Sequence, residues 1–93
     1  MKKKFILSAV VKEEKEGGYS VVCPELNVAS QGESFEEAIA NIKEALELYI
    51  ESAEEIGIMD DVLEQLGVSK KDFKKDVVAP SIVTASIPVE VSV

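Results

Sequence analysis

The sequence contains no histidine, and all ten of its basic residues are lysines, so it contains no arginine either. Without histidine there can be no catalytic triad, no imidazole general base and no histidine-ligated metal ion. Without arginine there can be no bidentate guanidinium contact to a phosphate group. These two absences remove the commonest catalytic sites and weaken the case for nucleic-acid recognition.

Cysteine and long apolar runs are also scarce. The single cysteine, Cys23, cannot form an internal disulfide, which is typical of a protein in a reducing cytoplasm. The apolar run FILSAVV at residues 5–11 is followed by charged residues and has no small-residue cleavage site, so we interpret it neither as a signal peptide nor as a membrane span. We expect a cytoplasmic protein that does not bind membranes.

Acidic residues are abundant, and 93 residues are enough for one domain, which we expect to cover residues 1–93. The formal net charge is −8, from 18 acidic and ten basic residues. Such a charge opposes binding to nucleic acid, because phosphate contacts need clustered cations. The charge favours high solubility or a basic partner.

A long helix is the clearest feature of the sequence. Ser34 stands at an N-cap position with Glu37 three residues later, which is the pattern of a capping box, and Gly57 is placed to end the helix. Apolar residues recur in one helical stripe at Phe35, Ala38, Ile39, Ile42, Ala45, Leu46, Tyr49, Ile50 and Ala53. The stripe is wide enough to pack on one face of a sheet.

Four segments have the apolar alternation of strands. They are residues 4–13, 19–23, 28–31 and 82–93. A polar turn with two glycines joins the first two, and Pro24 ends the second. The first segment is apolar on one face and half-apolar on the other, which is typical of a central strand. Pro88 lacks a ladder donor, so the last segment is expected at an edge or bulge, and part of it can pair with a second chain.

The order of these elements predicts an α+β fold. Three antiparallel strands form a meander, the long helix packs on one sheet face, and a right-handed crossover brings the fourth strand parallel to the first. The expected spatial order is 3-2-1-4, with a short helical excursion at residues 57–80 before the last strand. The other sheet face is apolar enough to favour a homo-oligomer, with self-association expected through Ile6, Val10, Val22, Val89 and Val91.

The helical excursion superficially resembles a helix-turn-helix. Asp61 and Glu64 form a possible capping pair, Gly67 would occupy the turn, and Ser69 would cap a second helix. Leu63 departs from that motif, because its position usually holds a small residue that lets the helices cross closely. We interpret the lysines that follow as a solvated patch in preference to a DNA contact; they are Lys70, Lys71, Lys74 and Lys75.

Three stretches resemble the HicB-type antitoxin family: GGYSVVCPEL at residues 17–26, the turn Gly32-Glu33-Ser34, and EEAIANIKEALELYI at residues 36–50. The resemblance spans residues 5–51. It implies a truncated ribonuclease-H-like domain that belongs to a toxin–antitoxin pair. Many members carry a DNA-binding domain beyond the last strand, whereas this sequence ends at Val93, so we expect a short form without operator binding.

The resemblance to a ribonuclease-H-like fold does not predict catalysis. That chemistry needs carboxylates converging on two metal ions, and the first strand, FILSAVV, contains no acid. We therefore expect no enzyme activity, no catalytic residues, no metal ion and no cofactor.

The outer face of the long helix is the best candidate for a binding surface. Its acids are Glu36, Glu44, Glu47, Glu51, Glu54 and Glu55, and Lys43 is its one cation. Leu48 is expected to be exposed among them, and an apolar spot ringed by acids suits a basic protein. We predict Glu44, Glu47, Leu48 and Glu51 as contacts for the partner that the resemblance implies, a small basic HicA-type toxin that cleaves RNA. The alternative is an orphan homo-oligomeric scaffold or regulatory module of the same fold.

Overall fold

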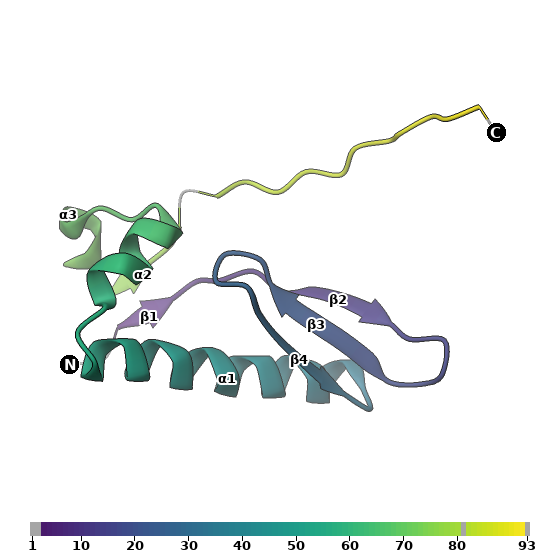
Figure 1. Cartoon of the computed structure of the whole chain (residues 1–93), viewed down its shortest axis with the longest axis horizontal. Helices are drawn as coiled ribbons and strands as arrows, with labels where there is room; N and C mark the ends of the chain where they lie inside the picture. The colour runs from purple at the N-terminus through teal and green to yellow at the C-terminus, as the bar shows by residue number, and fades with distance from the viewer. Residues whose placement is uncertain (1–2, 81, 93) are drawn as a thin grey trace.

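A three-stranded antiparallel sheet beside one long helix forms the larger part of the computed structural model, which describes residues 3–80 and 82–92 (Figure 1). A smaller part contains two short helices and a two-stranded parallel sheet. The elements, in chain order, are β1 (Lys4–Phe5), β2 (Val10–Glu13), β3 (Tyr19–Cys23), β4 (Val28–Gly32), α1 (Phe35–Glu55), α2 (Met59–Leu66), α3 (Lys70–Phe73) and β5 (Val77–Val78). The predicted α+β class, antiparallel meander and helix are confirmed.

The meander is joined as the sequence predicts. β2 and β3 pair antiparallel with Val10 opposite Val22, and β3 pairs antiparallel with β4. Gly17 and Gly18 complete the hairpin turn with φ angles of 102° and 82°, which glycine adopts at little cost. β3 ends at Cys23, before the proline.

Helix α1 has the predicted ends. The Ser34 hydroxyl accepts a hydrogen bond from the Glu37 backbone N–H at 3.1 Å, and Gly57 follows the helix with a φ of 78°. At the start of α1 the chain turns so tightly that a Cβ on Gly32 would lie within 2.8 Å of backbone atoms of Glu37 and Ala38. Only glycine fits this close approach between β4 and α1.

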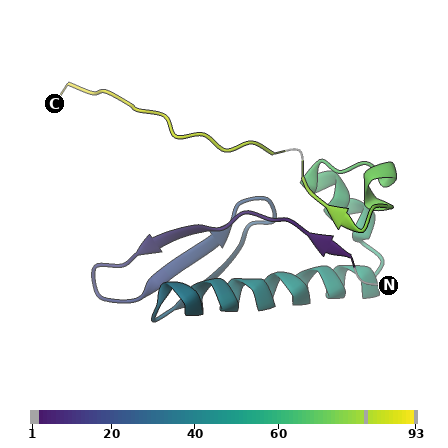
Figure 2. The ribbon, with the colours of Figure 1, turned by 180° about the vertical axis from the view of Figure 1, so that it is seen from behind.

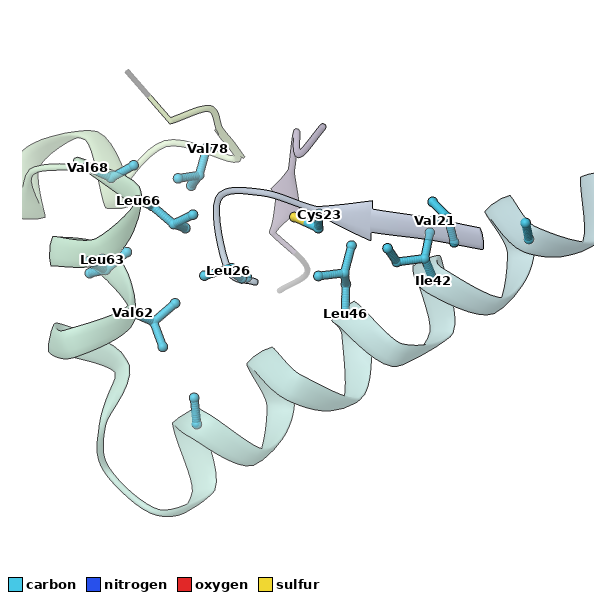
Figure 3. Close-up of a cluster of buried hydrophobic side chains, with 12 residues drawn as sticks. Val21, Cys23, Leu26, Ile42, Leu46, Val62, Leu63, Leu66, Val68 and Val78 are labelled. Carbon is cyan, nitrogen blue, oxygen red and sulfur yellow. The ribbon is translucent and has the colours of Figure 1, made fainter. Parts of the chain in front are cut away.

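One apolar cluster connects the two parts of the fold (Figure 3). In the larger part, β3 contributes Val21 and Cys23, and α1 contributes part of its predicted stripe, with Ile42 and Leu46 drawn close to them. Phe35, a predicted member of the stripe, is 48% exposed. Leu26, in the turn after β3, lies between these residues and the smaller part. The buried residues of the smaller part are Val62, Leu63, Leu66, Val68 and Val78.

The predicted first strand is divided into two, which is a correction. β1 pairs parallel with β5, whereas β2 lies at the edge of the meander and not at its centre, so the single-sheet order 3-2-1-4 is not confirmed. The backbone between them leaves the ladder because the Ser8 N–H donates to the Glu25 carboxylate at 3.0 Å. Glu25 lies in the turn after β3, so this contact is made across the fold.

The predicted last strand also needs correction. The parallel partner of β1 is the short segment Val77–Val78, and residues 82–92 run extended without a ladder partner among the described residues; Val93 lies outside them. This C-terminal tail, defined here as residues 82–92, projects away from the rest of the molecule in both views (Figures 1 and 2). Its apolar side chains are exposed because no other element of the described chain covers them; Val83 is 93% exposed and Ile87 is 77% exposed.

The short helical excursion is present, but its first cap differs from the prediction. α2 begins at Met59 after Ile58, which makes no side-chain capping bond, so Asp61 is inside the helix and is not its cap. Gly67 ends α2 in the left-handed conformation, and the Ser69 hydroxyl caps α3 as predicted. α3 has only four residues, which is too short for a recognition helix. No helix in the described part of the chain is long and apolar enough to cross a membrane.

Candidate functional site

The outer face of α1 carries a row of exposed carboxylates. Glu44, Glu47 and Glu51 follow one another at helical spacings of three and four residues, and all three are exposed. The Lys43 ammonium lies 3.4 Å from a Glu47 carboxylate oxygen, but both side chains are mostly in water, where such a pair contributes little. The row, called the acidic row below, therefore remains a source of negative potential.

Leu48 lies beside the acidic row and is 56% exposed. Its side chain also lines a shallow open groove of about 390 Å³ along the C-terminal half of α1 and the turn that follows. The groove is mainly apolar, and its other lining residues are Ala45, Tyr49, Ser52, Ala53, Ile56 and Ile58. Of the four predicted contact residues, Leu48 therefore lines the groove, and the three glutamates do not.

This groove is missing from the sequence prediction, which assigned Ala45, Tyr49 and Ala53 to the stripe beneath the sheet. Figure 1 shows β3 and β4 beside the first half of α1, whereas the second half extends beyond them. The signal in the sequence is the pair Ile56 and Ile58, which continue the apolar stripe past the end of the helix.

The residues predicted for self-association fall into two groups. Val10 and Val22 are cross-strand neighbours on the sheet face away from α1; Val10 is 55% exposed and Val22 is half-buried. Ile6 lies exposed in the segment between β1 and β2. Val89 and Val91 are exposed in the C-terminal tail, so this chain does not bring them together with the sheet residues.

The lysine patch at α3 is partly neutralised. Lys75 Nζ lies 3.3 Å from an Asp72 carboxylate oxygen, which offsets one of the four positive charges. Lys3 Nζ, which lies 4.8 Å from the centre of the Phe73 ring, adds a further cation beside the patch. The Ser69 hydroxyl, and then Lys75, hold the pKa of the Asp72 carboxyl below its ordinary value. Lys70, Lys71 and Lys74 are exposed.

Glu25 is a buried acid that sequence reasoning did not single out. It is 5% exposed, and its carboxylate accepts hydrogen bonds from the Ser8 N–H and, at 3.4 Å, from the Cys23 thiol. Burial alone would raise the pKa of Glu25, but these hydrogen bonds outweigh burial and lower it. Burial raises the pKa of the Cys23 thiol, which therefore stays protonated, as expected of a small core residue.

These groups do not form a metal site. In residues 3–80 and 82–92, no three cysteine or carboxylate side chains are arranged to hold a metal ion. The acidic row, Leu48 and the groove lie side by side on the exposed surface, and their role as partner contacts stays a prediction.

Three proteins of known sequence resemble this chain over about half of its length or more. A UPF0150 protein of Synechocystis sp. strain PCC 6803 is 54% identical over 46 residues, which cover 48% of this chain and 58% of the relative. A UPF0150 protein of Helicobacter pylori strain J99 is 49% identical over 47 residues, covering 50% of this chain and 64% of the relative. A second Synechocystis UPF0150 protein is 35% identical over 63 residues, covering 63% of this chain and 88% of the relative.

The chain thus spans less than two thirds of the length of the first two relatives. No solved structure matches it. The profile of a family described as the HicB_like antitoxin of bacterial toxin-antitoxin systems matches residues 7–89, which is most of the chain. This chain therefore belongs to the HicB-like antitoxin family.

Proposed function

We propose that this protein is an antitoxin that binds a small basic HicA-type toxin and masks its RNA-cleaving site. Membership of the antitoxin family supports a toxin as partner. The protein acts in this proposal by binding and not by catalysis. Its place of action is the cytoplasm, where the one thiol, Cys23, stays reduced.

The observation that carries the proposal is the acidic row beside Leu48 and the apolar groove. Separated charges on one face create a potential that attracts a basic protein from a distance and raises its association rate. Apolar contacts made after docking then slow dissociation, because they are lost only when the surfaces separate. Leu48 lies where these two kinds of contact meet.

The charge arrangement is not the one that helix stability alone favours. Glu47 and Glu51, and Glu51 and Glu55, are like-charged pairs four residues apart, each of which opposes helix formation by about 0.2–0.5 kcal/mol. The last turn of α1 contains no basic residue, although a cation there would interact favourably with the helix dipole. A partner-binding role accounts for carboxylates at these positions.

The test is co-expression with the product of a neighbouring gene for a small basic protein. We expect the two proteins to co-purify and this chain to relieve the toxicity of its partner. A triple variant, Glu44→Gln/Glu47→Gln/Glu51→Gln, should slow association by about 10- to 100-fold at low salt. A control variant with the same net charge, Glu16→Gln/Glu33→Gln/Glu64→Gln, changes exposed acids elsewhere and should associate nearly as fast as the wild type.

Leu48→Ser tests the apolar contact separately. It should raise the dissociation rate about tenfold while leaving the association rate nearly unchanged. Failure to co-purify with any small basic neighbour, or equal association rates of the triple variant and its control, would defeat the proposal.

An orphan homo-oligomeric scaffold or regulatory module is the second candidate function. The exposed apolar side chains of the C-terminal tail favour it, because they suit contact with another copy. A genome neighbourhood without a gene for a small basic protein would support this candidate over the antitoxin.

A further inference from the structure

We propose that the C-terminal tail of one copy adds as an edge strand to β2 of a second copy, and that two copies exchange their tails reciprocally. The inference concerns this chain alone and does not rest on its binding a toxin.

The tail has the chemistry of a strand that lacks its sheet. From Val83 on, apolar side chains alternate along the chain, and all are exposed: Val83, Ala85, Ile87, Val89 and Val91. Ile82, at the start of the tail, is also exposed. Glu90 is its one charged residue. The tail is already extended, and its 11 residues would span about 36 Å at the rise of a β-strand. Pairing would remove its apolar face from water and satisfy its backbone hydrogen-bonding groups.

The receiving edge is the outer side of β2. β3 pairs with one side of β2, and within the described residues no strand pairs with the other. Val10, on this edge strand, is exposed, and Ile6 is exposed just before it. An open edge with exposed apolar residues is a template for strand addition.

The tail cannot reach the edge of its own chain by continuing β5. β5 pairs with β1 in the register Lys4 to Val77, and continuing that register would place Val83 beside Val10. However, β1 and β2 belong to different sheets, because the backbone of Ser8 is held by Glu25. Pro80 also lacks the N–H needed to extend the β1 ladder.

A second copy offers the same edge without this geometric conflict. Beyond Pro80 the tail leaves the body in both views, as an exchanged segment does (Figures 1 and 2). Two copies that exchange tails form a closed, two-fold pair in which each β2 edge is covered once. The added tail would form the new outer edge of the sheet. Pro88 has no backbone N–H to donate there, which opposes the addition of further chains.

Charge favours a second copy over a basic partner at this place. The tail and β2 together carry Lys12, Glu13 and Glu90, so they offer little attraction to a cationic protein. Two copies, each with a net charge of −8, repel one another most strongly through their acidic helix faces. Contact through the tail and the β2 edge leaves those faces apart from the interface.

Sedimentation velocity and native mass spectrometry of the purified chain, without any toxin, test the proposal. The tail variant Ile87→Glu/Val89→Glu places two charges on the apolar face of the tail. It should raise the dissociation constant of the dimer about 100-fold or more. Its control, Thr84→Glu/Ser86→Glu, adds the same charge on the polar face of the tail and should remain dimeric. The edge variant Val10→Glu/Lys12→Glu keeps the tail intact and should also be monomeric; circular dichroism verifies that each variant is folded.

Mixing the tail variant with the edge variant is the decisive step. The edge variant still has an intact tail, and the tail variant still has an intact edge, so one of the two exchanges can form. We expect a heterodimer in the mixture although each variant alone is monomeric. A monomeric wild type at tens of micromolar, a tail variant that dimerises like the wild type, or a mixture without heterodimer would overturn the proposal. If the tails of two copies paired with each other instead, the mixture would contain no heterodimer.

Discussion

Strand β3 and the C-terminal tail have the same apolar alternation in the sequence but opposite environments in the structure. Val21 and Cys23 of β3 are 2% and 0% exposed, whereas Val83 and Ile87 of the tail are 93% and 77% exposed. The difference is that α1 packs on β3, while no element of the described chain packs on the tail. An alternating apolar pattern therefore predicts that a strand has one apolar face. It does not predict which element, or which chain, packs on that face.

The two halves of α1 differ in the same way. The first half packs its stripe against β3 and β4, and Ile42 is buried there (Figure 3). The second half buries Leu46 and Ala53 but also lines an open groove that ends at Ile56 and Ile58. We propose that other chains bind at these two exposed apolar surfaces, the tail and the groove.

The contrast between the core and the C-terminal tail can be tested with one substitution in each region. Ile42→Ala should lower the free energy of unfolding by about 2–5 kcal/mol, because it leaves a cavity in the core. Ile87→Ala should change the monomer by less than about 0.5 kcal/mol, because its side chain is mostly in water. Urea unfolding in dilute solution measures both, and equal losses would contradict the contrast between core and tail.

Glu25 helps to separate β1 from β2, because its carboxylate accepts a hydrogen bond from the backbone N–H of Ser8, which lies between these two strands. Glu25→Gln should cost about 1.5–3 kcal/mol at pH 7, since the buried hydrogen bonds lose their charged acceptor. The pKa of Glu25 is lowered in the folded protein from an ordinary value of 4.5, so its contribution is present above pH 4.5 and is lost as the pH falls through the folded value.

Urea unfolding at pH 7 and pH 3 measures this contribution. The stability difference between wild type and Glu25→Gln should be smaller at pH 3, because below pH 4.5 the unfolded chain binds a proton that the folded carboxylate resists. A difference that grows at low pH would mean that Glu25 is not stabilised in its charged form.

The junction between the sheet and the helix can be tested at Gly32. Gly32→Ala should destabilise the protein by about 1–3 kcal/mol, because the added Cβ meets backbone atoms of the first turn of α1 and the chain must shift. Gln31→Ala, one residue earlier, removes an exposed side chain and should cost less than about 0.5 kcal/mol. Thermal unfolding of the two variants is the measurement; equal melting temperatures would show that the approach of β4 to α1 is looser than described.

Helix capping should give the smallest effect. Ser34→Ala should cost about 1 kcal/mol, because it removes the acceptor of the Glu37 N–H bond at the start of a 21-residue helix. Ser69→Ala removes the same kind of cap from the four-residue α3, at an exposed corner of the fold, and should cost less. Chemical unfolding of both variants compares the two caps, and a larger loss at Ser69 would contradict this ranking.

The sequence predicts the features of the fold that depend on neighbouring residues. Helix α1, its cap at Ser34, its end at Gly57 and the hairpin at Gly17 and Gly18 all follow from short-range patterns. The division of the first strand does not, because it depends on a bond between Ser8 and Glu25, which are 17 residues apart. β5 has two residues, too few for any periodicity.

The candidate site, like the fold, is predictable from the sequence only where it depends on neighbouring residues. Helical periodicity alone places the acidic row together on one face of α1. The groove beside Leu48 is not predictable, because it exists only where the sheet stops short of the end of the helix. The extent of a sheet along a helix is a property of the whole fold.

Hydrogen–deuterium exchange of the full chain, measured below and above the concentration at which it dimerises, compares the tail and β3 most directly. If a second copy covers the tail, amides in residues 82–92 should exchange freely when dilute and become protected when concentrated, while amides of β3 stay protected throughout. Tail amides that exchange at the rate of an unstructured chain at every concentration would contradict the claim that another chain completes this strand.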